Sequence, residues 1–297
     1  MKCTYYPGCS QHSTARGYEE SIQTVAKPLD LELETLDDWN CCGATAYMSV
    51  NEVLSFCLTA RNLSLAAKAG HPVVTPCNAC FTNLRKTNAY MAEFPEVKAK
   101  VDEALGAGGM AYDGKTPTKH LLQVIVEDVG LEKIRGLVKR PLAGLRVAPY
   151  YGCQIVRPLG IEGGTDNPMM LDHLLEALGA TPTHFPMKTT CCGGSLMGTQ
   201  EDVALRLCRN LLLCAEQAKA DCIAVTCSLC QMNLDAYQQR INSNYGTHFN
   251  FPIVYFTQLM GLALGFEERQ LGLQRGVVPT SSLVRRGATA GAKEASS

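Results

Sequence analysis

Two groups of five cysteines, spaced almost identically, constrain the fold of this chain more than any other feature. In the first half a lone cysteine at position 9 precedes an adjacent pair at 41–42 and a CxxC segment at 77–80. In the second half the same three elements stand at 153, 191–192 and 227–230. Because the interval from the pair to the CxxC segment is the same in both halves, we infer two homologous halves. The groups are Cys9, Cys41, Cys42, Cys77 and Cys80, and Cys153, Cys191, Cys192, Cys227 and Cys230.

The residues around these cysteines repeat as well. The matching segments are "YYPGC" (5–9) with "YYGC" (150–153), "HPVVTPCNAC" (71–80) with "DCIAVTCSLC" (221–230), and more faintly residues 120–132 with 255–267. A first domain over 1–143 and a second over 144–275 are therefore expected. The remaining residues, 276–297, are small and polar, which favours a flexible tail or an arm that orders against a partner.

Short apolar or alternating segments predict a strand before each cysteine loop. The expected strands span 2–6, 31–36 and 72–75 in the first half, and 145–151, 180–186 and 222–226 in the second. Helical patterns at 18–29 and 167–179 alternate with them, and this alternation favours an α/β fold with a small parallel sheet flanked by helices in each half. Loops at the carboxyl ends of parallel strands meet at one edge, so five thiols of each half are expected to converge there.

A long helix is expected after each adjacent cysteine pair. The first has a capping-box pattern, Ser49 with Glu52, and is expected to end at Gly70. The second is expected to begin near Thr199 and Asp202 and to run to about Lys219.

Composition excludes several classes of function. The 297 residues carry a net charge of -1 and are 46% hydrophobic, which indicates a globular protein without general attraction to nucleic acid or anionic membrane. Neither a signal peptide nor a membrane span is expected from the pattern of apolar residues. Fifteen cysteines without an export signal favour metal binding in a reducing cytoplasm over a disulfide framework.

Three kinds of site compete for each cysteine group. Structural zinc uses four thiolates and leaves the fifth unexplained. A thioredoxin-like dithiol needs only the CxxC segment. An iron–sulfur centre, which we favour, uses convergent thiolates, although the ferredoxin spacing C-x2-C-x2-C-x3-C is absent from the sequence. A vicinal disulfide is disfavoured because adjacent Cα atoms lie about 3.8 Å apart, closer than an unstrained bridge requires. Glycines beside the thiols, which permit tight turns and close approach to a cluster, are Gly8, Gly43, Gly152, Gly193 and Gly194.

The doubled cysteine pattern resembles the CCG domain, and its tandem arrangement resembles the B-type subunit of heterodisulfide reductase over about residues 1–270. The resemblance implies one noncubane [4Fe-4S] cluster per group of five cysteines. It also implies reductive cleavage of a small disulfide, with one sulfur at each cluster. The implied partners are an iron–sulfur protein like the C-type subunit of that enzyme and a flavoprotein like its A-type subunit. A related sulfur-oxidising complex would add a lipoate-binding sulfur carrier.

One departure from this family affects the expected proton donor. Members often carry histidine directly after the first cysteine of the second group, where this chain has Gln154. Catalytic candidates near the clusters are therefore Gln154 itself, His12, His184 and Lys188, although each of these side chains is also compatible with a purely structural or solvated role. Arg157 and Lys188 could attract an acidic substrate or carrier, but single charges are more often ordinary surface residues.

The other cysteines are interpreted as small core residues, namely Cys3, Cys57, Cys208, Cys214 and Cys222. Two alternatives to disulfide chemistry remain open at this stage. One is a CCG electron-transfer subunit of a succinate, glycolate or lactate dehydrogenase. The other is a scaffold held by zinc.

Overall fold

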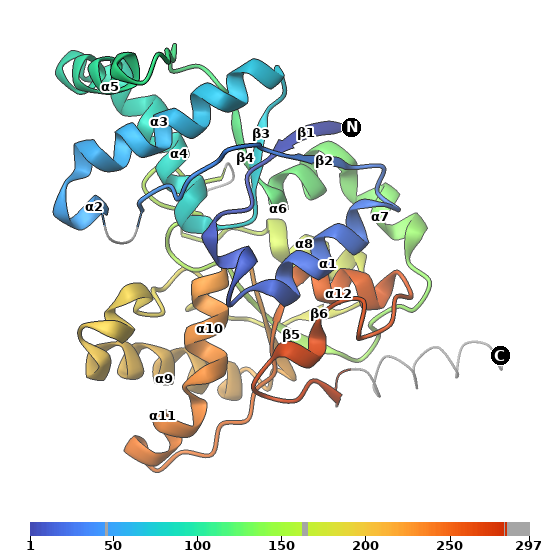
Figure 1. Cartoon of the computed structure of the whole chain (residues 1–297). Coiled ribbons are helices and arrows are strands. Elements are labelled where there is room, and N and C mark those ends of the chain that lie inside the picture. Colours follow the sequence, from blue (N-terminus) through green and yellow to red (C-terminus); the bar gives the residue numbers. More distant parts are fainter. Residues whose placement is uncertain (45–46, 162–165, 282, 284–297) are drawn as a thin grey trace.

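The first half of the chain forms a four-stranded parallel sheet. In the computed structural model, which describes residues 1–297 except 45–46, 162–165, 282 and 284–297, the strand order is β2-β1-β3-β4. All three pairings are parallel, with Tyr5 opposite both Thr35 and Val74 (Figure 1). The strands are β1 (Lys2–Tyr5), β2 (Glu32–Thr35), β3 (Val73–Thr75) and β4 (Thr118–His120).

The second half repeats this sheet in the order β6-β5-β7-β8, again with parallel pairing throughout. Its strands are β5 (Arg146–Tyr150), β6 (Thr181–Pro182), β7 (Cys222–Val225) and β8 (Ile253–Tyr255). The predicted α/β class with one parallel sheet in each half is thereby confirmed. The fourth strand of each sheet, β4 or β8, was missed because it runs directly into a helix, without a turn that marks where the strand ends.

These two missed strands explain the faint sequence echo between residues 120–132 and 255–267. His120 ends β4 and caps the following helix, and its backbone N–H donates to the side chain of Gln123. Tyr255 ends β8 and does the same with Gln258. The repeat therefore extends past the cysteines to the helix that follows the fourth strand of each sheet.

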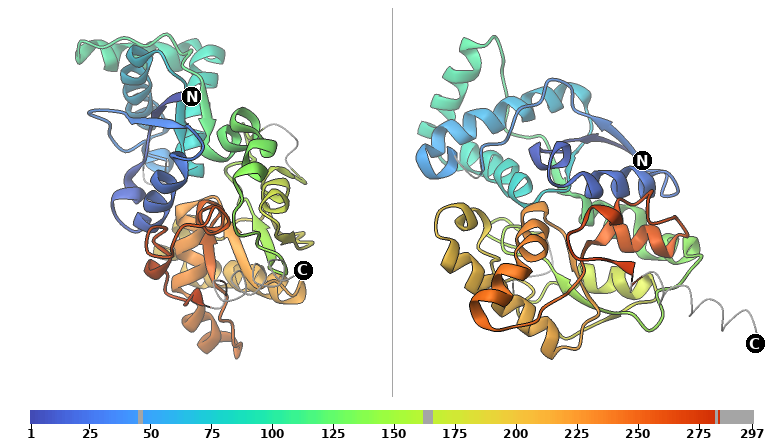
Figure 2. Two further views of the ribbon diagram at one scale, coloured as in Figure 1. Left: turned by 90° about the vertical axis from the view of Figure 1, so that its right-hand side faces the viewer. Right: turned by 60° about the horizontal axis from the view of Figure 1, so that its bottom comes forward.

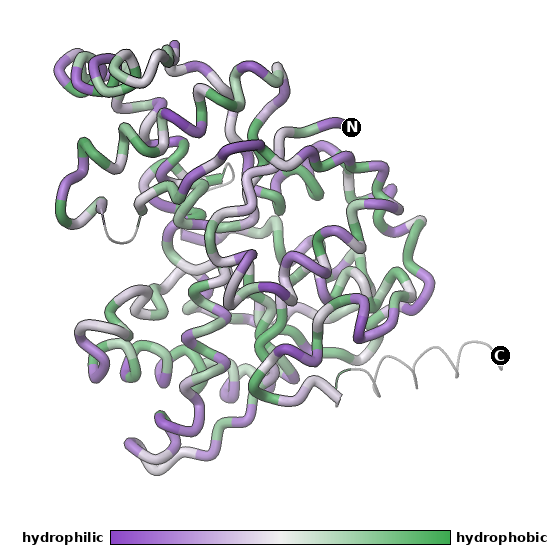
Figure 3. Tube along the Cα trace, viewed as in Figure 1, coloured by the Kyte–Doolittle hydropathy of each residue, from purple (hydrophilic) through white to green (hydrophobic). Residues whose placement is uncertain are grey.

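Helices cover both sheets and connect the parallel strands. In the first half they are η1 (Cys9–His12), α1 (Arg16–Ala26), α2 (Tyr47–Val50), α3 (Glu52–Ala69), α4 (Asn78–Glu93), α5 (Pro95–Ala107), α6 (Leu121–Gln123), the π-helix η2 (Val124–Gly130) and α7 (Leu131–Leu137). In the second half they are α8 (Met170–Ala177), η3 (Gly194–Gly198), α9 (Glu201–Gln217), α10 (Ser228–Ala236), α11 (Gln238–Tyr245), α12 (Phe256–Ala263) and η4 (Leu273–Arg275). Figure 3 shows the peripheral α11 as largely hydrophilic.

The predicted capping box at Ser49 is wrong. Ser49 belongs to the short helix α2, and the chain is extended at Asn51, whose side chain accepts a 3.0 Å hydrogen bond from the N–H of Leu54. Helix α3 therefore begins at Glu52, with Asn51 as its N-cap. Its predicted end is confirmed, because Gly70 adopts the left-handed conformation at φ 70°. Helix α9 spans Glu201–Gln217, close to the predicted range.

Helices of the two halves pack against each other where the halves meet. Helix α1 of the first half packs against α12 of the second, and α8 of the second packs against α6 and α7 of the first. Figure 2 shows this arrangement as two stacked halves joined along α1 and α12. Tyr18 stacks on Tyr255 with ring centroids 4.0 Å apart, and Ser21 Oγ lies 2.6 Å from Thr257 Oγ1. One buried core therefore runs through both halves, while the boundary predicted at residue 143 lies between α7 and β5.

The start of the predicted tail packs against the second half. The backbone N–H groups of Val277 and Val278 donate to the carboxylate of Asp235, and Leu283 is buried. The remainder of the predicted flexible tail or partner-binding arm, 284–297, lies outside the described residues. Among the helices that the structure describes, none combines the length and apolar character needed to cross a membrane.

Candidate metal centres

The first group of thiols gathers at the carboxyl ends of β1, β2 and β3. Cys9 opens η1, Cys77 precedes α4 and Cys80 lies in its first turn. The Sγ atoms of Cys41 and Cys9 are 4.0 Å apart, and those of Cys42 and Cys80 are 3.4 Å apart. The sequence prediction that thiols from three loops meet at this edge therefore agrees with the observed geometry.

The second group has the same arrangement after β5, β6 and β7. The Sγ atoms of Cys192 and Cys230 are 3.5 Å apart, matching the distance between Cys42 and Cys80. Burial follows one pattern in both groups. The lone cysteine and the first of the pair are exposed or half-buried, while the second of the pair and both CxxC cysteines are buried. Each group therefore has one edge nearer to solvent.

Backbone N–H groups point at the sulfurs of both adjacent pairs. Gly43 N lies 3.5 Å from Cys41 Sγ, and Gly193 N lies 3.3 Å from Cys191 Sγ. Gly194 N adds a third such contact, at 3.4 Å from Cys192 Sγ. Such donors stabilise negative charge on sulfur, as thiolate ligands require.

Hydrogen bonds lower the pKa of one thiol in each group. Hydrogen bonds from Cys42 and Cys9, together with the N–H of Gly43, hold the pKa of Cys41 far below its ordinary value. The pKa of Cys191 is lowered in the same way, chiefly by the lone cysteine of its own group. Metal binding displaces thiol protons, so clustered thiols in which one pKa is lowered suit a metal centre.

Gly8 and Gly152 bring the backbone close to the most buried thiols. Both have positive φ, 76° and 72°, and a Cβ built on them would lie 3.0 Å from Cys80 Sγ and 3.1 Å from Cys230 Sγ. Only glycine combines this conformation with this approach at low cost. The glycines predicted from the CCG and GC segments thus lie beside the thiols in both halves.

A tyrosine supports each adjacent pair, and the sequence analysis anticipated neither. Tyr6 donates from its hydroxyl to the carbonyl oxygen of Asn40 at 2.8 Å, directly before Cys41. Tyr150 donates to the carbonyl of Thr190 at 2.7 Å, directly before the second pair. Both rings are buried. The sequence did contain a signal for these tyrosines, because each stands two residues before the equivalent glycine, Gly8 or Gly152.

The predicted catalytic side chains fall into different environments. His12 is exposed and stacks on Trp39, with centroids 5.5 Å apart, at the loop that leads to Cys41. His184 is exposed and lines a cavity together with Lys188. Gln154 follows Cys153, and its backbone carbonyl accepts a hydrogen bond from Thr82. Among the four, Gln154 is adjacent to a cysteine of the groups, whereas His12 and Lys188 each lie three residues from one and His184 lies seven residues away.

Lys188 is paired with Asp172 and does not present a free ammonium group. Its Nζ lies 3.3 Å from Asp172 Oδ1, and both side chains are only 8% exposed. Tyr151 donates to the other carboxylate oxygen at 2.8 Å. We therefore interpret Lys188 as a structural residue of the second half.

Polar contacts tie the two groups of thiols together. Asn78, within the first CxxC segment, donates to the carbonyl of Tyr151 at 2.7 Å, and Thr226 donates to the same oxygen at 3.0 Å. The buried ring of His120 lies 3.2 Å from the carbonyl of Pro76, directly before Cys77. Neither Asn78 nor His120 was anticipated, because their partners are distant in the chain.

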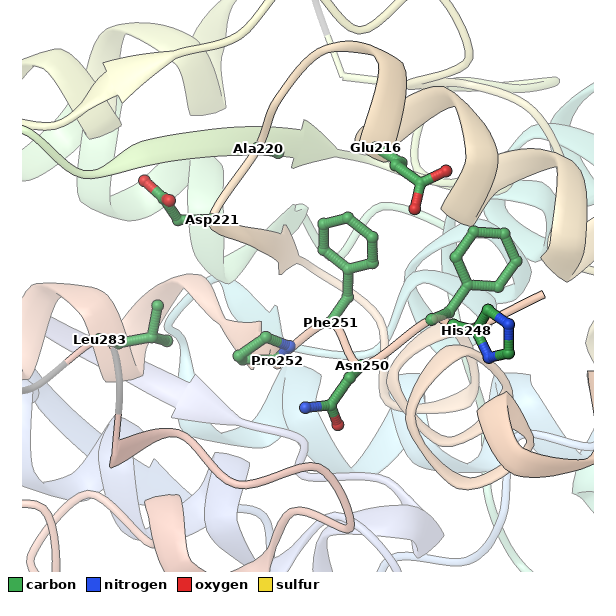
Figure 4. Close-up of a pocket in the computed structure, with 9 residues that line it drawn as sticks. Glu216, Ala220, Asp221, His248, Asn250, Phe251, Pro252 and Leu283 are labelled. Atoms are coloured by element: carbon green, nitrogen blue, oxygen red, sulfur yellow. The ribbon is translucent and has the colours of Figure 1, made fainter. Parts of the chain in front are cut away.

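Within the described residues, no group of three or more His, Cys, Asp or Glu side chains surrounds one point closely enough to hold a single metal ion. The cavity of about 260 Å³ shown in Figure 4 lies elsewhere, at the amino ends of β7 and β8. Its lining includes Glu216, His248 and Phe251.

Comparison with protein families gives a match to the CCG cysteine-rich domain over residues 3–85 and again over 147–235. The chain belongs to the CCG cysteine-rich domain family. Both copies contain a complete group of five cysteines. The match therefore coincides with the two structural repeats and with their thiol edges.

Curated relatives align over nearly their whole length. The chain is 33% identical to the 8-methylmenaquinol:fumarate reductase membrane anchor subunit of Wolinella succinogenes, covering 94% of this chain and 98% of the relative. It is 29% identical to the B-type subunit of the ferredoxin/F420H2-dependent CoB-CoM heterodisulfide reductase of Methanosarcina acetivorans, over 93% and 94%. It is 31% identical to an Archaeoglobus profundus protein named for its likeness to the heterodisulfide reductase B-type subunit, over 96% and 98%.

Among solved structures, a hypothetical protein from Helicobacter pylori has a similar fold. The TM-score is 0.75 at 15% identity, and the match covers 94% of this chain but 52% of that one. The chain thus spans about half of that protein, and the likeness concerns the fold alone.

Proposed function

We propose that this chain is the iron–sulfur subunit of a heterodisulfide reductase-type complex. It would interconvert thiols and a small disulfide, or sulfur bound to a carrier protein, at two noncubane [4Fe-4S] clusters. The observation that carries the proposal is the complete five-thiol group at the same edge of two pseudo-symmetric sheets. The proposal is also supported by the similarity of the chain to the heterodisulfide reductase B-type subunit and to a protein named for its likeness to that subunit.

The residues present fit such a cluster. Two sulfurs bound at about 2.3 Å to one tetrahedral metal ion lie roughly 3.8 Å apart, and the observed pairs at 4.0, 3.4 and 3.5 Å are close to this value. Several buried polar atoms near the thiols also lack a hydrogen-bond partner among the described residues. They are Gln11 Nε2 and Oε1, Asn83 Oδ1 and Asn233 Oδ1.

Under this proposal the ligands are the ten cysteines of the two groups. When bound, each cluster would supply an iron that polarises a substrate sulfur and accepts or donates single electrons. The chain's own residues exclude water from Cys42, Cys77 and Cys80 and leave Cys9 and Cys41 near solvent. A sulfur substrate would therefore approach from the edge formed by the exposed thiols.

The proposed partners are an iron–sulfur protein like the C-type subunit and a flavoprotein like the A-type subunit, because this sequence carries no flavin, nicotinamide or ferredoxin motif of its own. A lipoate-binding sulfur carrier would replace the small disulfide if the reaction oxidises sulfur. His12, beside Trp39 and on the same short helix as Cys9, is the candidate proton donor at the first edge.

A second candidate function has direct support from one relative. The similarity to the fumarate reductase subunit of Wolinella succinogenes favours an electron-transfer role in a quinol-linked fumarate or succinate complex. The same ten cysteines would then hold the clusters, but no disulfide would be cleaved. The two functions thus differ in substrate rather than in the metal site.

Anaerobic purification followed by iron and sulfide analysis tests the proposal. We expect about eight irons per chain, four for each cluster. Cys41→Ser and Cys192→Ser should each lose about half of the iron. Cys57→Ser is the matched control, since Cys57 lies outside both groups and should retain all iron. Zinc without iron, or full iron in both ligand variants, would contradict the assignment.

Substrate assays separate the two functions. The intact protein is supplied with a reduced viologen dye and either a small heterodisulfide or a menaquinone analogue. Thiol release from the heterodisulfide supports the first function. Reduction of the quinone without any thiol release would support the electron-transfer role instead.

A further inference from the structure

Two buried asparagines occupy equivalent positions beside the thiol groups. Asn83 and Asn233 each lie three residues after the last cysteine of their group, and both are at most 2% exposed. The Oδ1 atom of each amide lacks a hydrogen-bond partner among the described residues. The amide N–H groups therefore carry the polar interactions of both side chains, and their partners differ between the halves.

In the first half the amide is directed at backbone and hydroxyl oxygens. Asn83 Nδ2 lies 2.6 Å from the carbonyl oxygen of Cys42, and 2.9 Å from both Ser55 Oγ and Thr59 Oγ1. Thr59 donates to the same Cys42 carbonyl at 2.9 Å. This network holds the cysteine pair in place without a contact between the amide and a sulfur.

In the second half the two hydroxyls are replaced. Ala204 is the equivalent of Ser55. A Cβ built on Gly193 would lie 2.8 Å from Ala204, and a Cβ built on the equivalent Gly43 would lie 3.2 Å from Ser55. Cys208, one helical turn later, donates to the Cys192 carbonyl at 3.2 Å, as Thr59 does in the first half. Cys208 is thus more than the core filler that its sequence position indicated.

Because these positions no longer hold the amide, Asn233 turns to the cysteine sulfur. Its Nδ2 lies 2.9 Å from the carbonyl of Gly194 and 3.6 Å from Cys192 Sγ. The carbonyl can only accept a hydrogen bond, so the nitrogen, not the oxygen, faces the sulfur. Backbone N–H groups do not distinguish the two halves, because each of the two sulfurs has one such donor. Ala44 donates to Cys42 and Gly194 donates to Cys192.

We propose that Asn233 is a positioning residue whose N–H···S contact with Cys192 makes the second cluster easier to reduce than the first. The inference rests on the proposed function, since it needs a cluster bound at each group. Hydrogen bonds to cluster sulfurs are one determinant of reduction potential, because they stabilise the more negative, reduced state. Electrons would then collect at the second cluster before the first.

The test is a redox titration of the intact protein, followed by visible absorption and EPR. Asn233→Leu should lower the potential of the second cluster and leave the first unchanged, at full iron content. Asn83→Leu is the matched control, which should destabilise the fold without shifting either potential. The Cys41→Ser background, lacking the first cluster, assigns the remaining signal.

A second pair of variants keeps the asparagines and changes their partners. Ala204→Ser/Cys208→Thr should draw the Asn233 amide away from sulfur and lower the second potential. Ser55→Ala/Thr59→Cys should release Asn83 toward Cys42 and raise the first. Iron-loaded variants with unchanged potentials would overturn this inference alone, whereas wild-type protein that binds no iron would overturn the proposed function as well.

Discussion

Asn78 donates a 2.7 Å hydrogen bond from its side-chain amide to the backbone carbonyl of Tyr151, across the boundary between the two halves. Asn78 directly follows Cys77, and Tyr151 precedes Cys153 by two residues. Thr226, directly before Cys227, donates to the same carbonyl. One backbone oxygen therefore links loops that carry cysteines of both groups, and the two proposed clusters are held in a defined relation.

Replacing Asn78 by alanine should weaken this link. The variant removes a buried hydrogen bond and leaves Thr226 as the remaining partner, so we expect a loss of about 1–2 kcal/mol in the free energy of unfolding. Urea denaturation measures it. Gln23→Ala, which removes an exposed bond to Glu19, should change stability by less than about 0.5 kcal/mol. Equal losses in the two variants would contradict the assigned role of Asn78.

Substituting Gly8 by alanine should cost iron as well as stability. Its Cβ would meet Cys80 Sγ at 3.0 Å, and the backbone has φ 76°. Gly70→Ala separates the two effects, because Gly70 has φ 70° but nothing within 4 Å of the added atom. We expect both variants to lose about 1 kcal/mol from backbone strain, but only Gly8→Ala to lose iron. Retention of all iron in Gly8→Ala would show that the close approach is unimportant.

The ion pair between Lys188 and Asp172 predicts a structural phenotype. Lys188→Met leaves a buried carboxylate without its cation, which should cost about 3–5 kcal/mol. The double variant Lys188→Met/Asp172→Leu should recover most of this loss, apart from about 1 kcal/mol for the bond from Tyr151. Thermal unfolding measures both. If the double variant folds well but has lost all activity, Lys188 or Asp172 is catalytic after all.

His120 should make the protein less stable in mild acid. Burial lowers the pKa of its imidazole from 6.5 to about 3. Between these values the unfolded chain binds a proton that the folded chain does not, so stability present above pH 6.5 is lost as the pH falls. The loss should be about 1.4 kcal/mol per pH unit below 6.5. Urea midpoints at pH 8 and 5.5 measure it, and His120→Gln should show a correspondingly smaller difference.

The repeat and the thiol edge could be predicted because both depend on local patterns. A strand followed by a loop with Cys9 or Cys153 places that cysteine at the carboxyl end of a sheet, whatever the rest of the fold does. The cap of α3 was misjudged because Ser49 and Asn51 are both good N-cap residues, and a short preceding helix decided between them. The strands β4 and β8 were missed because each continues directly into a helix, so no turn residue separates the two elements in the sequence.

The sequence by itself determined that ten cysteines fall into two equivalent groups and that parallel sheets would gather each group at one edge. Only the tertiary structure decided what surrounds them: the pairing of Lys188 with Asp172, the packing of helices of one half against those of the other, and the turning of Asn233 toward Cys192. These arrangements arise from packing between segments distant in the chain. For example, Thr59 in the first half and Cys208 in the second occupy equivalent places, and this difference redirects Asn233 only because the side chains meet in the folded protein.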